Sequence, residues 1–262
     1  MVAVTFDLVC LRVRKLLASL QDARFARALR LGVAPTIDHR QALARLDPEL
    51  VIDIGANRGQ FALFARHCWP RARIVSFEPL PAAGTLCRAV MSGDPNFTLI
   101  EAAVAVNRGT SAINITVDDD SSSLLPLGER HQALYGSTVA QTLEVQTGRL
   151  TDFLAAAEIP PSALIKIDVQ GFELEVLKAS EDVLQLVSHI YAELSFVELY
   201  GGQPLAGEAV SYLDARGFDL AGVYNQSVDR AASPIQADML FSRRQRSRDR
   251  GEAGNITYET FH

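Results

Sequence analysis

Short apolar runs alternate with helical patterns along most of the chain from residue 50 onward. Each apolar run has the length and the Val, Ile and Leu content of a buried strand. The runs lie at 50–54, 73–77, 97–106, 164–169 and 189–194, and the helical patterns lie at 60–68, 81–91, 151–157, 172–178 and 205–216. Strands that alternate with helices form right-handed βαβ units around a parallel sheet. The pattern therefore predicts an α/β fold.

The end of this region breaks the alternation. Residues 218–224 and 237–242 have the pattern of two further strands, with no helical pattern between them. Two strands that are joined without a crossover helix pair antiparallel. We therefore expect a mostly parallel seven-stranded sheet with an antiparallel last strand.

Three segments do not follow the strand–helix alternation of the α/β domain, which we place at residues 48–243. Apolar residues at helical spacing predict helices at 4–31 and 39–46. Two alternating patterns, at 111–117 and 142–147, predict strands that flank a polar loop, and long loops of this kind often form lids. The segments are a helical N-terminal extension at 1–47, a lid-like insertion within the domain at 107–147 and a polar, Arg-rich tail at 244–262.

Composition excludes several classes of protein. The 262-residue chain has a net charge of −6, which argues against a nucleic-acid binder that acts through charge. The sequence contains no run of about 18 apolar residues, the length that a membrane-spanning helix needs, so we expect no stable membrane insertion. The cysteines Cys10, Cys68 and Cys87 are odd in number and form no C-x-x-C pair, which disfavours a disulfide framework or a zinc site. We expect a cytoplasmic protein with free thiols.

A glycine-bearing turn follows the first predicted strand and precedes a helix. It has the sequence Asp-Ile-Gly-Ala-Asn-Arg-Gly, from Asp53 to Gly59. Gly55 and Gly59 remove side chains where a ligand would approach, and the helix N-terminus offers N–H groups to a carboxylate or phosphate. The G-x-x-x-G spacing differs from the G-x-G-x-x-G spacing of dinucleotide sites. The turn predicts a nucleotide-like cofactor but does not identify it.

Acidic residues end three other strands. Glu78 ends the second strand, where a carboxylate suits the two hydroxyls of a ribose. Asp168 falls where a buried strand emerges at the carboxyl end of the sheet, and ligands bind at that end in open α/β sheets. Lys166 shares the face of Asp168 and needs a partner, because an unpaired buried charge is costly. Glu193, at the end of the next strand, is the candidate partner for a structural ion pair.

Four segments, in this order, resemble the FkbM family of methyltransferases. They are Val51–Phe61, Phe77–Pro79, Ser122–Leu124 and Ile165–Glu173, and the resemblance extends over about residues 50–242. The resemblance implies a class I, Rossmann-like methyltransferase fold with S-adenosylmethionine as its cofactor. It also implies O-methylation of a hydroxyl on a sugar, a polyketide or another secondary metabolite.

The resemblance also implies which residues bind the cofactor. The turn would hold the methionine end, and Glu78 would hold the ribose. The full set is Asp53, Gly55, Ala56, Asn57, Gly59, Gln60, Phe61, Glu78, Pro79 and Asp168. Ser122 and Ser123 match the serine loop of the family, to which no role is assigned.

Methyl transfer to an alcohol requires alignment of the reacting atoms and benefits from a general base. Asp168 is the first candidate for this base. His39, which precedes the first strand, is the second, and His131 in the insertion is a further one. A metal held by Asp168, Glu193 and a histidine has no ligand motif to support it, so we expect no metal.

Two other functions stay open at this point. An NAD(P)-dependent oxidoreductase would share the glycine turn and Glu78, but it does not explain the Phe-Glu-Pro segment or the motif around Asp168. A non-catalytic module that retains the fold would also bind the cofactor. For an enzyme, we expect a small hydroxylated acceptor under loop 118–140. Exposed strand edges and the N-terminal helices are candidate interfaces for a homo-oligomer.

Overall fold

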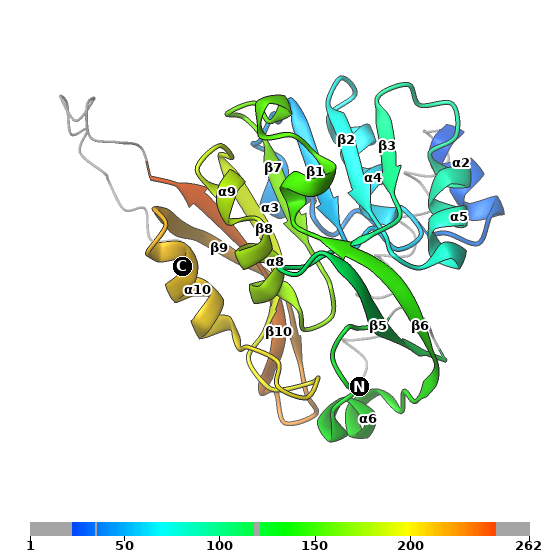
Figure 1. Ribbon diagram of the computed structural model, residues 1–262, viewed down its shortest axis with the longest axis vertical. Coiled ribbons are helices and arrows are strands. Elements are labelled where there is room, and N and C mark those ends of the chain that lie inside the picture. The colour runs from blue at the N-terminus through cyan, green and yellow to red at the C-terminus, as the bar shows by residue number, and fades with distance from the viewer. Residues whose placement is uncertain (1–22, 35, 118–120, 245–262) are drawn as a thin grey trace, which may run out of the picture.

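A seven-stranded sheet forms the centre of the protein in the computed structural model, which describes residues 23–34, 36–117 and 121–244 (Figure 1). In spatial order its strands are β3 (Phe97–Ile100), β2 (Arg73–Phe77), β1 (Leu50–Ile54), β7 (Leu164–Ile167), β8 (His189–Ser195), β10 (Pro234–Arg243) and β9 (Phe218–Val228). Neighbours from β3 to β8 pair parallel, whereas β10 pairs antiparallel with both β8 and β9. The predicted α/β class and sheet are confirmed.

Helices cover both faces of this sheet (Figure 1). Side chains alternate between the two faces along each strand, so Val51 packs into one layer and its neighbours Leu50 and Ile52 into the other. One layer contains α2 (Ala23–Arg30), α3 (Arg40–Leu43), α4 (Gln60–Cys68) and α5 (Pro81–Val90). The opposite layer contains α7 (Leu150–Phe153), α8 (Glu173–Ala179), α9 (Glu181–Leu184) and α10 (Ala206–Asp214).

A second, three-stranded sheet is built from the predicted insertion and the residues just before it. Strands β5 (Gly109–Thr116) and β6 (Val139–Gly148) pair antiparallel, and β4 (Ala103–Val104) pairs parallel with β6. The short helix α6 (Glu129–Tyr135) lies between β5 and β6 in the sequence, and Figure 1 shows it at the far end of this hairpin. Both strand patterns expected in this segment are therefore present, and its role as a lid stays a prediction.

The segment 97–106, which was predicted to hold one strand, holds two short strands. The chain forms β3 in the large sheet and then, after two residues, β4 in the small one. The division arises because β6 offers a pairing edge to Ala103 and Val104, so the chain changes sheets after Ile100. A run of apolar residues cannot reveal such a change.

The predicted helices differ from the observed ones mainly in length. The helix at 39–46 is a single turn, α3, because the chain then turns into β1 and the Leu46 carbonyl accepts a hydrogen bond from the Trp69 indole. The helix at 151–157 is shorter too, since α7 is followed by a 3-10 turn at Ala156–Glu158. Helix α9 was not predicted.

Several predictions fall wholly or partly outside the described residues. The helix at 4–31 is seen only as α2, and the Arg-rich tail is represented only by Arg244. Cys10 also lies outside, whereas Cys68 and Cys87 are free thiols. Among the helices of the described ranges, none is long and apolar enough to cross a membrane.

The strand order places a topological switch point between β1 and β7. From β1 the chain proceeds outward to β2 and β3, and after the second sheet it returns to the other side of β1 as β7. Ligands of open α/β sheets bind at the carboxyl ends of the strands that flank such a point. The predicted turn at Asp53–Gly59 and the predicted Asp168 both lie there.

Gly55 allows the chain to pass this point. Its φ is 84°, and a Cβ atom there would lie 1.8 Å from the carbonyl oxygen of Asp168. The Asp168 N–H donates a hydrogen bond to the Ile54 carbonyl at 3.0 Å, which holds the two chain segments together. The expectation that Gly55 only makes room for a ligand is therefore incomplete, because its missing side chain faces a neighbouring backbone.

We predict that Gly55→Ala destabilises the protein by about 2–4 kcal/mol more than Gly217→Ala does. Both glycines have the same strained backbone, with φ of 84° and 82°, but nothing lies within 4 Å of a Cβ at Gly217. Urea unfolding of the two variants measures the difference, and a Gly55→Ala variant that does not fold is the extreme of the same result. Equal losses in the two variants would show that the close approach costs nothing.

Candidate active site

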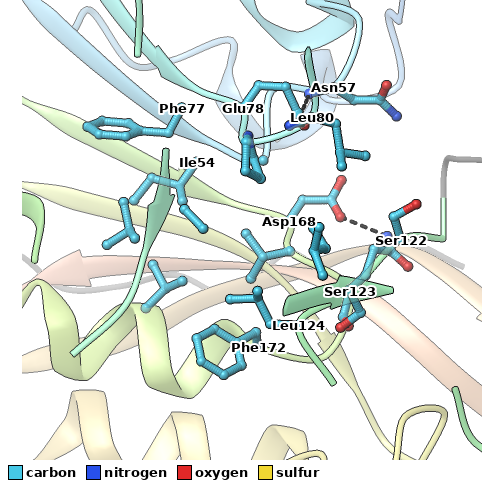
Figure 2. Close-up of a pocket in the computed structure, with 18 of the residues that line it drawn as sticks. Ile54, Asn57, Phe77, Glu78, Leu80, Ser122, Ser123, Leu124, Asp168 and Phe172 are labelled. Atoms are coloured by element: carbon cyan, nitrogen blue, oxygen red, sulfur yellow. Dashed lines mark hydrogen bonds between the residues drawn. The ribbon is translucent and has the colours of Figure 1, made fainter. Parts of the chain in front are cut away.

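A cleft of about 730 Å³ opens at the carboxyl ends of β1, β2 and β7. Figure 2 shows Glu78 and Asn57 on one side of the cleft, Ser122 and Ser123 on the other, and Asp168 between them. The cleft is lined by Ile54, Gly55, Asn57, Phe77, Glu78, Pro79, Leu80, Ala102, Ala103, Val104, Ile113, Ser122, Ser123, Leu124, Asp168, Val169, Gln170, Phe172 and Val176.

The turn after β1 is fixed by hydrogen bonds to the end of β2. The N–H groups of Gly55 and Ala56 both donate to the carbonyl of Phe77, at 3.0 and 2.9 Å. Asn57 adopts a left-handed conformation with φ of 48°, and Gly59 begins α4 with φ of 88°. A Cβ at Gly59 would lie 3.0 Å from the thiol of Cys87, so this glycine also serves packing.

Glu78 joins the turn to the end of β2. Its carboxylate accepts hydrogen bonds from the N–H of Asn57 at 2.7 Å and from the N–H of Leu80 at 2.8 Å. The side chain is buried, and burial raises its pKa to about 7, although the two backbone hydrogen bonds oppose the shift. A carboxylate is thus held at the cleft with one bond to each oxygen, which leaves further lone pairs for a ligand.

Asp53 does not reach the cleft. It is completely buried, where it accepts a hydrogen bond from the Ser76 hydroxyl at 3.2 Å and lies 3.5 Å from the ammonium of Lys166. Burial raises the pKa of Asp53, and Lys166 opposes that shift. Asp53 thus supports the turn from beneath and does not line the cleft, and its expected contact with the cofactor stays a prediction.

Lys166 is the centre of an ion-pair network below the cleft. Its ammonium lies 3.5 Å from a carboxylate oxygen of Asp53, 3.5 Å from one of Asp168, and 3.2 Å from the carbonyl of Gly55. Burial alone would lower the pKa of Lys166, but Asp168 and Asp53 outweigh it and raise the pKa above its usual value. The ammonium is therefore charged.

The sequence had suggested Glu193 as the partner of Lys166, but the two side chains do not form a direct ion pair. The Glu193 carboxylate accepts a hydrogen bond from the Gln236 amide at 2.7 Å, and burial raises its pKa well above the usual value. The prediction of a Lys166–Glu193 ion pair is wrong because the carboxylates of Asp53 on β1 and Asp168 just after β7 lie closer to the ammonium. The pairing register decides this, since Lys166 lies directly opposite Asp53.

Asp168 is the charged side chain of the cleft that remains accessible. It is 36% exposed, whereas Glu78 is 5% exposed. One of its carboxylate oxygens lies near Lys166, and the other accepts a hydrogen bond from the Gln170 amide at 3.0 Å (Figure 2). A fixed carboxylate with an accessible face can accept a proton or a hydrogen bond from a molecule in the cleft.

Glu173 stabilises the turn between β7 and α8. One of its carboxylate oxygens accepts hydrogen bonds from the N–H groups of Val169 at 3.2 Å and Gly171 at 3.0 Å. The side chain is buried, and burial raises the pKa of Glu173 to about 7. The sequence did not single out this residue, because a Glu in the first turn of a helix is common.

The structure does not bring His39 to the cleft. The ring of His39 packs against those of Phe61, Phe64 and Tyr191, and its Nδ1 lies 3.1 Å from the Tyr191 hydroxyl and 3.5 Å from a carboxylate oxygen of Asp238. His39 belongs to the layer of α3 and α4. The prediction that it takes part in catalysis is not supported by this position.

Four predicted cofactor residues also lie away from the cleft lining. Phe61 is buried in the core of the α4 layer, with the Lys166 ammonium 5.4 Å from its ring centre. Ala56, Gly59 and Gln60 belong to the turn and to the start of α4 but do not line the cleft. Gly55, Asn57, Glu78, Pro79 and Asp168 do line it.

His131 lies on helix α6, and its side chain is buried. Its ring packs against those of Tyr135 and Tyr200, at centroid distances of 4.8 and 5.2 Å, and burial lowers its pKa. It does not line the cleft. Across the part of the chain that the structure describes, no group of three or more His, Cys, Asp or Glu side chains is arranged to hold a metal ion.

Sequence reasoning missed the apolar wall of the cleft. Ala103 and Val104 of β4 and Ile113 of β5 form part of it, together with Leu80 and Phe172. These residues come from the small sheet and from two loops, and their types are those of ordinary core residues. Only the pairing of β4 with β6 would have indicated that this segment faces the site.

The strand order and the cleft at the switch point define a Rossmann-like fold of the class I methyltransferase type. The family model described as the methyltransferase FkbM domain matches residues 53–220. The chain belongs to this family of methyltransferases. The family resemblance seen in the sequence is thereby confirmed.

Two curated relatives agree with the family match. The 2-O-methyltransferase NoeI of Sinorhizobium fredii is 32% identical over 200 residues, which cover 72% of this chain and 82% of that protein. The 31-O-demethyl-FK506 methyltransferase FkbM of Streptomyces tacrolimicus is 28% identical, with 65% and 72% covered. A solved rRNA methylase from Streptococcus thermophilus has a TM-score of 0.45 at 16% identity, with 79% and 94% covered. The family assignment rests on the family match and on the first relative.

We predict that Glu173→Gln raises stability at pH 8 by about 2–3 kcal/mol relative to its effect at pH 5. The folded pKa of Glu173 lies above its unfolded value, so ionisation weakens the folded state as the pH rises from about 4.5 to about 7. Gln retains the single oxygen that accepts both backbone hydrogen bonds. Urea unfolding at the two pH values measures the effect.

Glu175→Gln, on the same helix, is the matched control, because Glu175 is partly exposed and pairs with Lys178. Its effect should differ between the two pH values by less than about 0.5 kcal/mol. An equal effect of Glu173→Gln at pH 5 and pH 8 would contradict the buried, proton-binding state of Glu173.

Proposed function

We propose that this chain transfers the methyl group of S-adenosylmethionine to a hydroxyl of a sugar, a polyketide or another secondary metabolite. The observation that carries the proposal is Asp168, an accessible carboxylate that is fixed at the cleft by Lys166 on one oxygen and Gln170 on the other. A carboxylate in this position can receive the proton of an alcohol acceptor. The family of methyltransferases to which the chain belongs provides the reaction class.

The cleft has the features that an adenosine requires. Its wall of apolar side chains suits the adenine, and the Glu78 carboxylate suits the ribose hydroxyls because it keeps free lone pairs after binding two N–H groups. We assign the methionine end to the turn at Gly55 and Asn57, at the switch point. When bound, S-adenosylmethionine supplies a methyl group on an already activated sulfonium.

The protein itself would then contribute alignment and proton transfer. Alignment of the acceptor oxygen with the methyl group lowers the barrier, and its effect reaches several kcal/mol in well-oriented reactions. Asp168 would accept the hydroxyl proton of the acceptor. Lys166 supports this role, since its ammonium lies 3.5 Å from one oxygen of Asp168 and helps to hold the carboxylate in place.

The names of the relatives support an oxygen acceptor. One is a 2-O-methyltransferase, and another is a 31-O-demethyl-FK506 methyltransferase. The likeness to the relative with 32% identity covers 72% of this chain and 82% of that protein, so it extends over most of both. We infer that β5, α6 and β6, as a lid, and the N-terminal helices shape the acceptor site.

A screen of acceptors tests the reaction. The purified protein would be incubated with S-adenosylmethionine and a panel of methyl glycosides of hexoses, 6-deoxyhexoses and hexuronic acids, together with a hydroxylated macrolide. Release of S-adenosylhomocysteine with one of them is the expected result. Binding of S-adenosylhomocysteine without release on any acceptor would favour a non-catalytic module, and binding of NADH alone would favour an oxidoreductase.

We predict that Glu78→Ala weakens the binding of S-adenosylhomocysteine by about tenfold or more, because a hydrogen bond to a charged group is lost. Glu101→Ala is the matched control: Glu101 follows the neighbouring strand β3, is exposed and pairs with Arg88. Its Kd should stay within about twofold of that of the wild type. Isothermal titration measures both values, and an unchanged Kd in folded Glu78→Ala would exclude Glu78 from the site.

We predict that Asp168→Asn lowers kcat by about 100-fold or more, because Asn cannot accept the proton. The Kd of S-adenosylhomocysteine should change much less. Asp219→Asn, which removes an exposed carboxylate of β9 that pairs with Arg244, should leave both values near those of the wild type. Equal losses in kcat and affinity for Asp168→Asn would make Asp168 a binding residue and not a base.

A further inference from the structure

Gln170 has an unusual backbone conformation beside the cleft. Its φ is 55°, in the left-handed region that residues other than glycine, asparagine and aspartate rarely adopt. It follows β7 by three positions and lies between Asp168 and the start of α8. Strained residues of this kind persist only where the surrounding structure holds them. The contacts of Gln170 therefore need an explanation.

Gln170 is held at three atoms, by groups from three different segments. Its backbone carbonyl accepts a hydrogen bond from the Ser123 hydroxyl at 2.6 Å. Its side-chain oxygen accepts one from the Tyr200 hydroxyl at 2.8 Å, and its side-chain nitrogen donates to a carboxylate oxygen of Asp168 at 3.0 Å. Ser123 belongs to the serine loop at 121–123, whose role the sequence left unassigned.

The orientation of the Gln170 amide follows from these partners. A carboxylate can only accept a hydrogen bond, so the NH₂ group must face Asp168. The amide oxygen then faces Tyr200, whose hydroxyl can donate to it. The same hydroxyl lies 3.1 Å from the carbonyl of Ser121, which links Tyr200 to the serine loop as well.

The Gln170 contact completes the restraint of the Asp168 carboxylate. Lys166 lies 3.5 Å from one oxygen of Asp168, and Gln170 binds the other oxygen. A carboxylate that is bound at only one oxygen can rotate about its side-chain bonds. With both oxygens located, the plane of the carboxylate is fixed relative to the cleft.

We propose that Gln170 is a positioning residue that sets the orientation of Asp168, and that Tyr200 and the serine loop hold Gln170 in place for this task. The proposal rests on the proposed role of Asp168 as the general base. It gives the serine loop a function: Ser123 fixes the backbone of Gln170, and Tyr200 fixes its side chain.

Gln170→Asn is the most informative variant. Asn accepts the left-handed conformation, so the turn and its bond from Ser123 are kept, but the side chain is one methylene too short to join Tyr200 to Asp168. We expect kcat to fall by about tenfold or more, with the methyl glycoside or macrolide that turns over fastest in the screen as acceptor. The Kd of S-adenosylhomocysteine should stay within about twofold.

Tyr200→Phe tests the second contact and keeps the aromatic ring. It should lower kcat in the wild type but have little further effect in Gln170→Asn, because it acts through Gln170. Tyr212→Phe is the matched control, since it removes the hydroxyl of a tyrosine on α10 that is bonded to Glu181 and does not line the cleft. Its kcat should equal that of the wild type.

Crystal structures with S-adenosylhomocysteine provide a readout that does not depend on turnover. The Asp168 carboxylate should keep one orientation in the wild type and in Tyr212→Phe. In Gln170→Asn it should rotate or occupy two orientations. An unchanged, single orientation in Gln170→Asn would overturn the proposal.

The kinetic outcomes separate this proposal from the proposed function. If Asp168→Asn retains wild-type turnover, the role of Asp168 as base fails, and the positioning role fails with it. If Asp168→Asn loses turnover but Gln170→Asn and Tyr200→Phe keep it, only the positioning role is overturned. Equal losses in kcat and in cofactor affinity for Gln170→Asn would also overturn it, because they indicate a structural role.

Discussion

The rest of the site depends on the ion pairs that the buried ammonium of Lys166 forms with Asp53 and Asp168. The ammonium lies between a carboxylate of β1 and one at the end of β7, and a buried charge without such partners would be strongly destabilising. Ser76, Asp53 and Lys166 are register partners on three adjacent strands, so the network also fixes how β2, β1 and β7 align. A shift of one residue would turn these side chains to the other face of the sheet.

This alignment places the cleft and provides its two acidic groups with different environments. Glu78 is buried, binds two backbone N–H groups and holds the turn after β1 against the end of β2. Asp168 stays accessible, although Lys166 pairs with one of its carboxylate oxygens and Gln170 donates a hydrogen bond to the other. Two carboxylates at the ends of β2 and β7, on either side of β1, can therefore serve different purposes, one in binding and one in proton transfer.

The sequence predicted the sheet and the location of the site well, because hydrophobic periodicity and the glycine turn are local signals. It failed where the outcome depends on contacts between distant segments. The division of residues 97–106 depends on an edge offered by β6, and the partner of Lys166 depends on strand register. Asp53 and His39 carry chemistry that suits a site, yet one is buried beneath the turn and the other packs among aromatic rings.

The two-residue strand β4 has a consequence for how the enzyme can respond to its substrates. Ala103 and Val104 line the cleft, and the same residues form the edge of the sheet that carries the β5–β6 hairpin. One short wall is thus common to the cleft and to the small sheet. A displacement of the β5–β6 hairpin would move this wall directly, without any hinge in the large sheet, and would change the shape of the cleft.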